Sequence, residues 1–166
     1  MDILKASTDW AKAEMLSNSA FLLFGALFLA ASIAFWQVGR TDMARAYVMP
    51  TLVSGVLLLI LGTGLLYGTW NTLAGYGPAV AQDAPAFVAS EITRADRTIA
   101  QYGTAVFKVI PLLIVVAAAL IIVLNGPAWR AGLITTIAFL SIVMLVDSNA
   151  SGRLEAYRQQ LAATSR

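Results

Sequence analysis

Cysteine and histidine are both absent from the 166 residues, and the two absences exclude much of the familiar chemistry of protein sites. Without cysteine the chain has no disulfide, no thiolate nucleophile and no cysteine-ligated zinc or iron–sulfur centre. Without histidine it lacks the commonest general base, the commonest metal ligand and the usual haem ligand. We therefore expect no cofactor and no metal site.

Charge is scarce as well. Charged residues make up 12% of the chain and hydrophobic residues 59%, whereas a soluble domain has about 25% charged residues. The formal net charge of +2 is too small to indicate a nucleic-acid partner. The composition is that of a protein whose main partner is the lipid bilayer.

Long apolar runs fill most of the sequence. Each approaches the length of about 20 residues that crosses a hydrocarbon core of about 30 Å as a helix. They predict an all-α fold, an integral membrane bundle of four transmembrane helices in a single domain, residues 1–166. The predicted spans are residues 20–38, 48–69, 105–124 and 129–149.

More polar segments separate and flank these spans. Residues 2–16 predict a short interfacial helix, which Ser17-Asn18-Ser19 either breaks from the first span or joins to it as a turn. Gly75, Gly77 and Pro78 predict a loop at the start of residues 71–104. We expect the third and fourth helices to extend into the cytoplasm, the fourth as a tail over residues 150–163.

Basic residues are distributed unevenly around the spans. Of the eleven, eight lie beside the termini or the segment between the second and third spans, and only Arg40, Arg45 and Arg130 lie in the other two links. Basic loops face the cytoplasm. Acidic residues near the N-terminus argue against a cleavable leader. These features predict a multi-pass protein of the plasma membrane, the bacterial inner membrane, with both termini cytoplasmic.

A heptad-like apolar seam follows Pro85. Steps of four and three residues continue along the segment and again after the fourth span, which is typical of helices that pack on a neighbouring helix. We expect one helix from about residue 85 to residue 124, bent at most near Gly103 or Pro111. The seam residues are Val88, Ile92, Ala95, Ile99, Tyr102, Leu154, Tyr157 and Leu161.

Glycines in the second span predict close helix packing. Gly64 and Gly68 form a GxxxG pair, and Gly55 lies two turns earlier. Small residues at this spacing let a second helix backbone approach. Gly62-Thr63-Gly64 resembles part of a nucleotide-binding loop, but the strand and the Lys-Ser/Thr of such a loop are missing. Helix packing is the better interpretation.

Asp147 is the most informative single residue because an ionisable side chain in a span is costly without a partner. Folding the hairpin about Gly126 puts Asp147 and Lys108 at nearly the same membrane depth, so an intramembrane charge pair is plausible. Lys108 could instead extend to anionic lipid. Asp147 is then either a structural residue at headgroup depth or part of a cation path.

Acidic and basic residues alternate between the second and third spans. Glu91 and Asp96 lie among Arg94 and Arg97, at spacings that suit pairs on a helix surface such as Glu91 with Arg94. A metal site would need several converging carboxylates. The pattern therefore favours a solvated helix face.

No motif carries a recognisable reaction, so we expect the protein not to be an enzyme. The favoured prediction is a non-catalytic membrane protein that acts by helix–helix association, as a homo-oligomer or as an accessory subunit bound to another membrane protein. The alternative is an oligomeric ion channel or small-solute transporter with Asp147 near the pathway. A membrane lipid enzyme is the least favoured class.

Overall fold

A computed structural model describes residues 2–164, and every regular element within that range is helical. Four stretches of it are long and apolar enough to cross a membrane, which suggests a multi-pass membrane protein. The elements are α1 (Ile3–Val38), α2 (Asp42–Ala46), α3 (Val48–Gln82), α4 (Ala84–Thr104), the π-helical η1 (Ala105–Val109), α5 (Ile110–Val123) and α6 (Pro127–Thr164).

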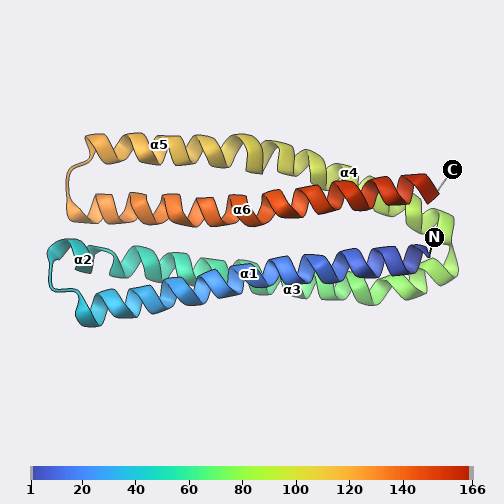
Figure 1. The fold of residues 1–166 in the computed structure, drawn as a ribbon, viewed down its shortest axis with the longest axis horizontal. Coiled ribbons are helices and arrows are strands. Elements are labelled where there is room, and N and C mark those ends of the chain that lie inside the picture. Colours follow the sequence, from blue (N-terminus) through green and yellow to red (C-terminus); the bar gives the residue numbers. More distant parts are fainter. Residues whose placement is uncertain (1, 165–166) are drawn as a thin grey trace.

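The long helices run back and forth along one axis, so the molecule is an elongated bundle (Figure 1). Both termini lie at one end, together with the turn from α3 to α4. The links from α1 to α3 and from α5 to α6 lie at the other end (Figure 1). The helix α1 packs chiefly against α3, and α5 packs chiefly against α6, which also contacts α1 and α4. The bundle is therefore two hairpins, joined mainly by the contacts of α6 with α1 and α3.

The predicted interfacial helix and the first span are one continuous helix, α1. It begins after Asp2, whose carboxylate accepts a hydrogen bond from the Lys5 backbone nitrogen at 3.2 Å. Asn18 does not interrupt it, because this side chain is buried against α3, where Nδ2 donates to Thr69 Oγ1 at 3.5 Å. Because Asn18 packs on α3, α1 continues through the position where the sequence allowed a break.

The prediction of a loop that starts at residue 71 is wrong for most of the segment. The helix α3 continues through Gly75, Gly77 and Pro78 to Gln82, and only Asp83 leaves the helical conformation. Asp83 then caps α4 by accepting a hydrogen bond from the Ala86 backbone nitrogen at 2.9 Å. Proline in a helix interior costs about 3 kcal/mol. The tertiary contacts of this end of α3, described below, offset that cost.

The expectation of one helix from about residue 85 to residue 124 is confirmed, since α4, η1 and α5 are continuous. The π-helical turn lies between Gly103 and Pro111, the two predicted bend points. Ile110 donates its backbone N–H to the Ala105 carbonyl five residues earlier. The helix α6 is likewise continuous past Asp147. Gly126, with φ of 144°, provides the turn between α5 and α6.

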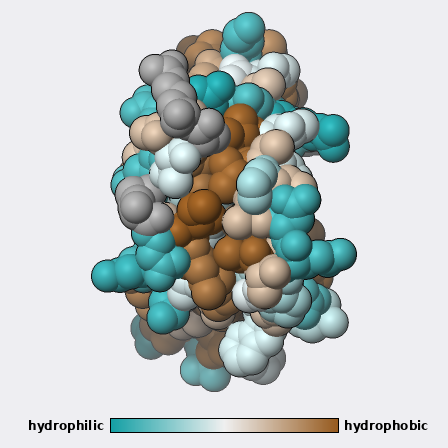
Figure 2. Space-filling view, turned by 90° about the vertical axis from the view of Figure 1, so that its right-hand side faces the viewer, coloured by the Kyte–Doolittle hydropathy of each residue, from teal (hydrophilic) through white to brown (hydrophobic). Residues whose placement is uncertain are grey.

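Two separate groups of buried side chains hold the bundle. In the apolar part, Phe21, Leu58 and Val146 bring α1, α3 and α6 together. The larger group lies towards the end that carries the termini. Seen from that end, hydrophobic residues form a central strip that hydrophilic residues flank (Figure 2). The polar part of the chain therefore has a core of its own.

Candidate functional site

The candidate functional site is a polar network within the larger buried group. Its centre is Glu91 on α4, which is only 6% exposed. Arg94, one turn later, donates from Nε to Glu91 Oε1 at 2.9 Å and from Nη2 to Glu91 Oε2 at 2.7 Å. A bidentate pair of this kind is stronger than neutral hydrogen bonds and fixes the orientation of both groups.

Two tyrosine hydroxyls also donate hydrogen bonds to the Glu91 carboxylate. Tyr76 on α3 donates to Glu91 Oε2 at 3.3 Å, and Tyr157 on α6 donates to the same oxygen at 3.1 Å. Tyr157 Oη also lies 2.8 Å from Ser7 Oγ on α1. Because Tyr157 gives its proton to Glu91, the Ser7 hydroxyl is the donor in this second bond, and the Ile3 carbonyl at 3.0 Å is its alternative acceptor. Hydrogen bonds therefore link all four long helices around one carboxylate.

Trp10 on α1 packs against two members of this network. Its ring stacks on Tyr157, with centroids 5.0 Å apart and planes 14° from parallel. The Arg94 guanidinium lies 4.8 Å from the Trp10 ring centroid, which is the geometry of a cation–π contact. We call these residues the Glu91 network: Ser7, Trp10, Tyr76, Glu91, Arg94 and Tyr157.

The electrostatics keep the two phenols and the guanidinium of the network in one protonation state each. Burial, and after it the charge of Glu91, raises the pKa of Tyr76 far above its usual 10. Burial also raises the pKa of Tyr157 and outweighs the lowering by the Ser7 hydrogen bond, and the charge of Glu91 raises this pKa further. Burial disfavours the charge on Arg94, but hydrogen bonding to Glu91 raises its pKa overall. Both phenols thus stay donors and Arg94 stays cationic.

This arrangement is suited to holding helices together. The Glu91 oxygens accept four hydrogen bonds, which is about the capacity of a carboxylate. Oε2 accepts three of these bonds and Oε1 accepts one, all from side chains of the network. Among residues 2–164, no group of three or more acidic, histidine or cysteine side chains is placed to bind a metal ion.

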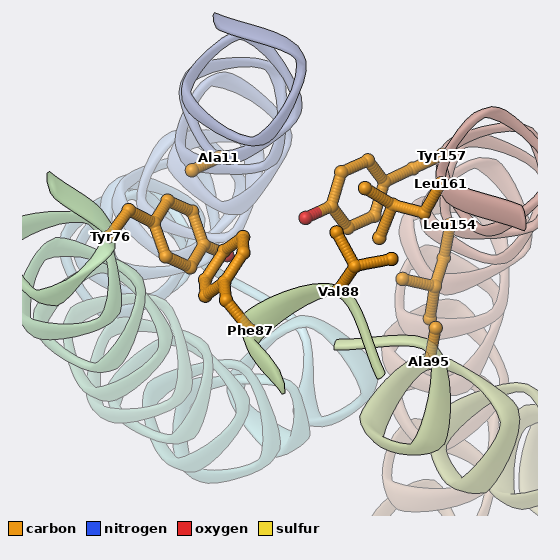
Figure 3. Packing of buried hydrophobic residues seen from close by; sticks show 8 residues of the cluster. All are labelled: Ala11, Tyr76, Phe87, Val88, Ala95, Leu154, Tyr157 and Leu161. Atoms are coloured by element: carbon orange, nitrogen blue, oxygen red, sulfur yellow. The ribbon is translucent and has the colours of Figure 1, made fainter. Parts of the chain in front are cut away.

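The structure brings the predicted seam residues together around the network. Val88 and Ala95 of α4 are buried in one cluster with Leu154, Tyr157 and Leu161 of α6 (Figure 3). Partly buried seam residues pack against this cluster, namely Ile92, Ile99 and Tyr102. The seam therefore joins α4 to α6 within a single chain.

Other members of the cluster were not predicted from the sequence. Tyr76, Phe87 and Ala11 complete it, with the Tyr76 and Phe87 rings 5.4 Å apart in an edge-to-face contact (Figure 3). A signal for the α1 face was present, because Ser7, Ala11 and Asn18 follow helical spacing and all are buried. No comparable signal pointed to Tyr76, because it lies between Gly75 and Gly77 in the segment that was predicted to be a loop.

The prediction of a solvated face for Glu91 is wrong, although its pairing with Arg94 is confirmed. Glu91 lies three residues after Val88 and four before Ala95, so it shares their face of α4. Asp96 lies on the open side, where its carboxylate is 2.9 Å from Arg158 Nε. The spacing of each acid from the seam residues distinguishes buried Glu91 from exposed Asp96, whereas the charge pattern does not.

Asp147 and Lys108 do not pair in this structure. Lys108 is exposed on η1, and the ion pairs of residues 2–164 do not include either side chain. Asp147 is partly buried near Glu14 of α1, which pairs with Arg153 of α6 at 3.2 Å. Burial, and then the charges of Glu14 and Asp147, raise the pKa of Tyr102 to about 12.

The three predicted packing glycines fall into two groups. A Cβ on Gly55 would lie 2.9 Å from Leu29 Cδ2 and 3.0 Å from the Gly25 carbonyl oxygen, so Gly55 lets α3 approach α1. A Cβ on Gly64 or Gly68 would meet nothing within 4 Å. The GxxxG pair therefore faces away from the rest of this chain.

Comparison of the chain with protein-family models, with curated proteins and with solved structures finds no match. The functional proposal below therefore depends on the residues and contacts of this chain.

Proposed function

We propose that the protein is a non-catalytic multi-pass membrane protein that acts by helix–helix association, as a homo-oligomer or as an accessory subunit of a larger membrane complex. Its environment in this proposal is the bacterial inner membrane, with both termini in the cytoplasm. In this proposal the Glu91 network holds the two hairpins together at the cytoplasmic end.

The proposal rests on one observation: the chain itself buries only a small part of the surface of its apolar helices. In the most apolar stretch of the third long helix only 11% of the residues are buried. Ala117 is the one buried residue of α5. Large exposed apolar surfaces mark contacts with membranes or with other proteins.

Shape favours a protein contact in addition to lipid. A hollow of about 530 Å³ lies on α3 at Gly64, between Ile60 and Tyr67. A second helix could place its ridge there, because small residues permit close backbone approach. Lipid tails cover apolar surface equally well but gain nothing specific from a GxxxG pair.

The buried polar chemistry also favours a non-catalytic role. Glu91 is only 6% exposed, and its carboxylate accepts hydrogen bonds from Arg94 and from two tyrosines of other helices. A buried ion pair is best attested as a device that specifies one arrangement of helices. The network supports a rigid subunit whose exposed spans are free to bind other helices.

Replacing Gly64 by leucine should weaken association without unfolding the chain. The new side chain occupies open space in the monomer but would hold a partner helix away from α3. We expect at least about a tenfold loss of association, or ~1.4 kcal/mol. The measurement is energy transfer between labelled copies in liposomes, together with the amount of any membrane protein that co-purifies in mild detergent.

Gly132→Leu is the matched control, because a Cβ at Gly132 on α6 also meets nothing within 4 Å. Equal effects of the two substitutions would exclude the α3 face. A chain that is monomeric in liposomes and purifies without a partner would overturn the proposal. A closed homo-oligomer that conducts ions, and loses conduction in Asp147→Asn, would favour the channel alternative.

The proposed topology has its own test. A reporter enzyme that is active only outside the cytoplasm should give no signal when fused after Arg166, and a strong signal when inserted in the link of residues 37–46. The reason is the concentration of basic residues beside the termini and the segment between the second and third spans. The opposite pattern of signals would invert the orientation.

A further inference from the structure

We propose that the junction of α4 and η1 binds the headgroup of one anionic phospholipid, and that the adjoining face of α5 holds an acyl chain of the same lipid. A shallow hollow on this face is lined by Arg97, Ala100, Gln101, Thr104, Ala105 and Val109. The apolar run of the third span begins at Ala105, so the hollow lies at the boundary between polar and apolar surface.

The charges at this boundary suit a phosphate. Arg97 and Lys108 take no part in the ion pairs of residues 2–164, which use Arg94, Arg153 and Arg158. Both cations are exposed, and no acidic residue lines the hollow. Cations at this depth attract anionic lipid headgroups.

Spacing places these donors on one face of the helix. Arg97, Gln101, Thr104 and Lys108 follow steps of four, three and four residues. The rise from Arg97 to Lys108 is about 16 Å. The amide of Gln101 and the hydroxyl of Thr104 lie between the two cations. A phosphate at the level of these donors would have the guanidinium on one side and the ammonium on the other.

The acyl chain has a site on the same helical stripe. Val109 lines the hollow, and Leu113 and Val116, four and seven residues later, line an apolar groove of about 630 Å³. Met49 of α3 and Phe139 of α6 form its other walls, so the groove lies between the two hairpins. Its lining carries no charged side chain. The headgroup site is thus followed along the same helix by a groove for hydrocarbon. This order matches a phospholipid rather than a soluble phosphate.

The first test uses the full chain in nanodiscs that contain equal amounts of phosphatidylglycerol and phosphatidylcholine, with retained lipid counted by native mass spectrometry. We expect preferential retention of one phosphatidylglycerol, and at least a tenfold loss of that preference in Arg97→Gln/Lys108→Gln. Lys5→Gln/Lys12→Gln removes the same charge from exposed positions on α1 and should change nothing. Equal retention of both lipids, or equal effects of the two double variants, would overturn the proposal.

The second test concerns the groove and the source of the phosphate. Val116→Trp should lower retention by filling the groove, whereas Val115→Trp, at a position 64% exposed and outside the groove lining, should not. Inorganic phosphate at millimolar concentration should not displace the lipid, and displacement would contradict an acyl-chain site. The lipid site presupposes membrane insertion but not helix association, so a monomeric chain that retains phosphatidylglycerol supports the lipid site while refuting the proposed function.

Discussion

Replacing Glu91 by alanine is expected to lower the free energy of unfolding by about 3 kcal/mol, because breaking a buried ion pair from one side typically costs 3–5 kcal/mol. The substitution leaves Arg94 without its carboxylate and removes the acceptor of Tyr76 and Tyr157. The Arg94 side chain is 36% exposed, so water partly solvates it and the cost falls at the low end. Unfolding in mixed micelles of increasing denaturing detergent measures the change.

Asp96→Ala is the control for Glu91→Ala on the same helix. Asp96 pairs with Arg158, but the two side chains are 51% and 40% exposed, and such surface pairs contribute about 0–1 kcal/mol. Replacing both Glu91 and Arg94 by leucine should recover part of the loss, because no unpaired charge remains. Similar small losses for Glu91→Ala and Asp96→Ala would show that the network does not hold the helices together.

Gly55→Leu should destabilise the hairpin of α1 and α3 by about 1–3 kcal/mol, the usual cost of overpacking. The new Cβ would lie 3.0 Å from the Gly25 carbonyl oxygen, and that backbone atom cannot move without shifting α1. Gly64→Leu gains the same intrinsic helix propensity but meets open space. The difference in unfolding free energy between the two variants therefore reports packing alone.

The expected loss for Gly55→Leu should appear in the monomer, in detergent at high dilution, where association makes no contribution. Gly64→Leu should be at least as stable as the unmodified chain under the same conditions, with a gain of up to about 1 kcal/mol from helix propensity. Equal stability of Gly55→Leu and Gly64→Leu would mean that α3 does not pack on α1 as closely as the structure shows.

Local sequence patterns specify the helices and their apolar character. Long apolar runs and seams with steps of three and four residues are local signals, and each needs only its own neighbours along the chain. For this reason the continuous helix over residues 85–124 and the extension of the fourth span past Asp147 were predicted correctly. The pairing of Glu91 with Arg94 is equally local, since one helical turn separates them.

The positions of the polar residues, by contrast, depend on how the helices pack against one another. Glu91 is buried because three other helices converge on it, and no local pattern of charges specifies that convergence. The helix α3 continues through Pro78 because Tyr76 and its neighbours gain contacts that offset the local preference for a break. Gly55 rather than Gly64 contacts α1 because the relative rotation of two helices selects which glycines meet. Partners distant in sequence depend on packing free energies summed over the whole bundle, and those outweigh local propensities of about 1–3 kcal/mol.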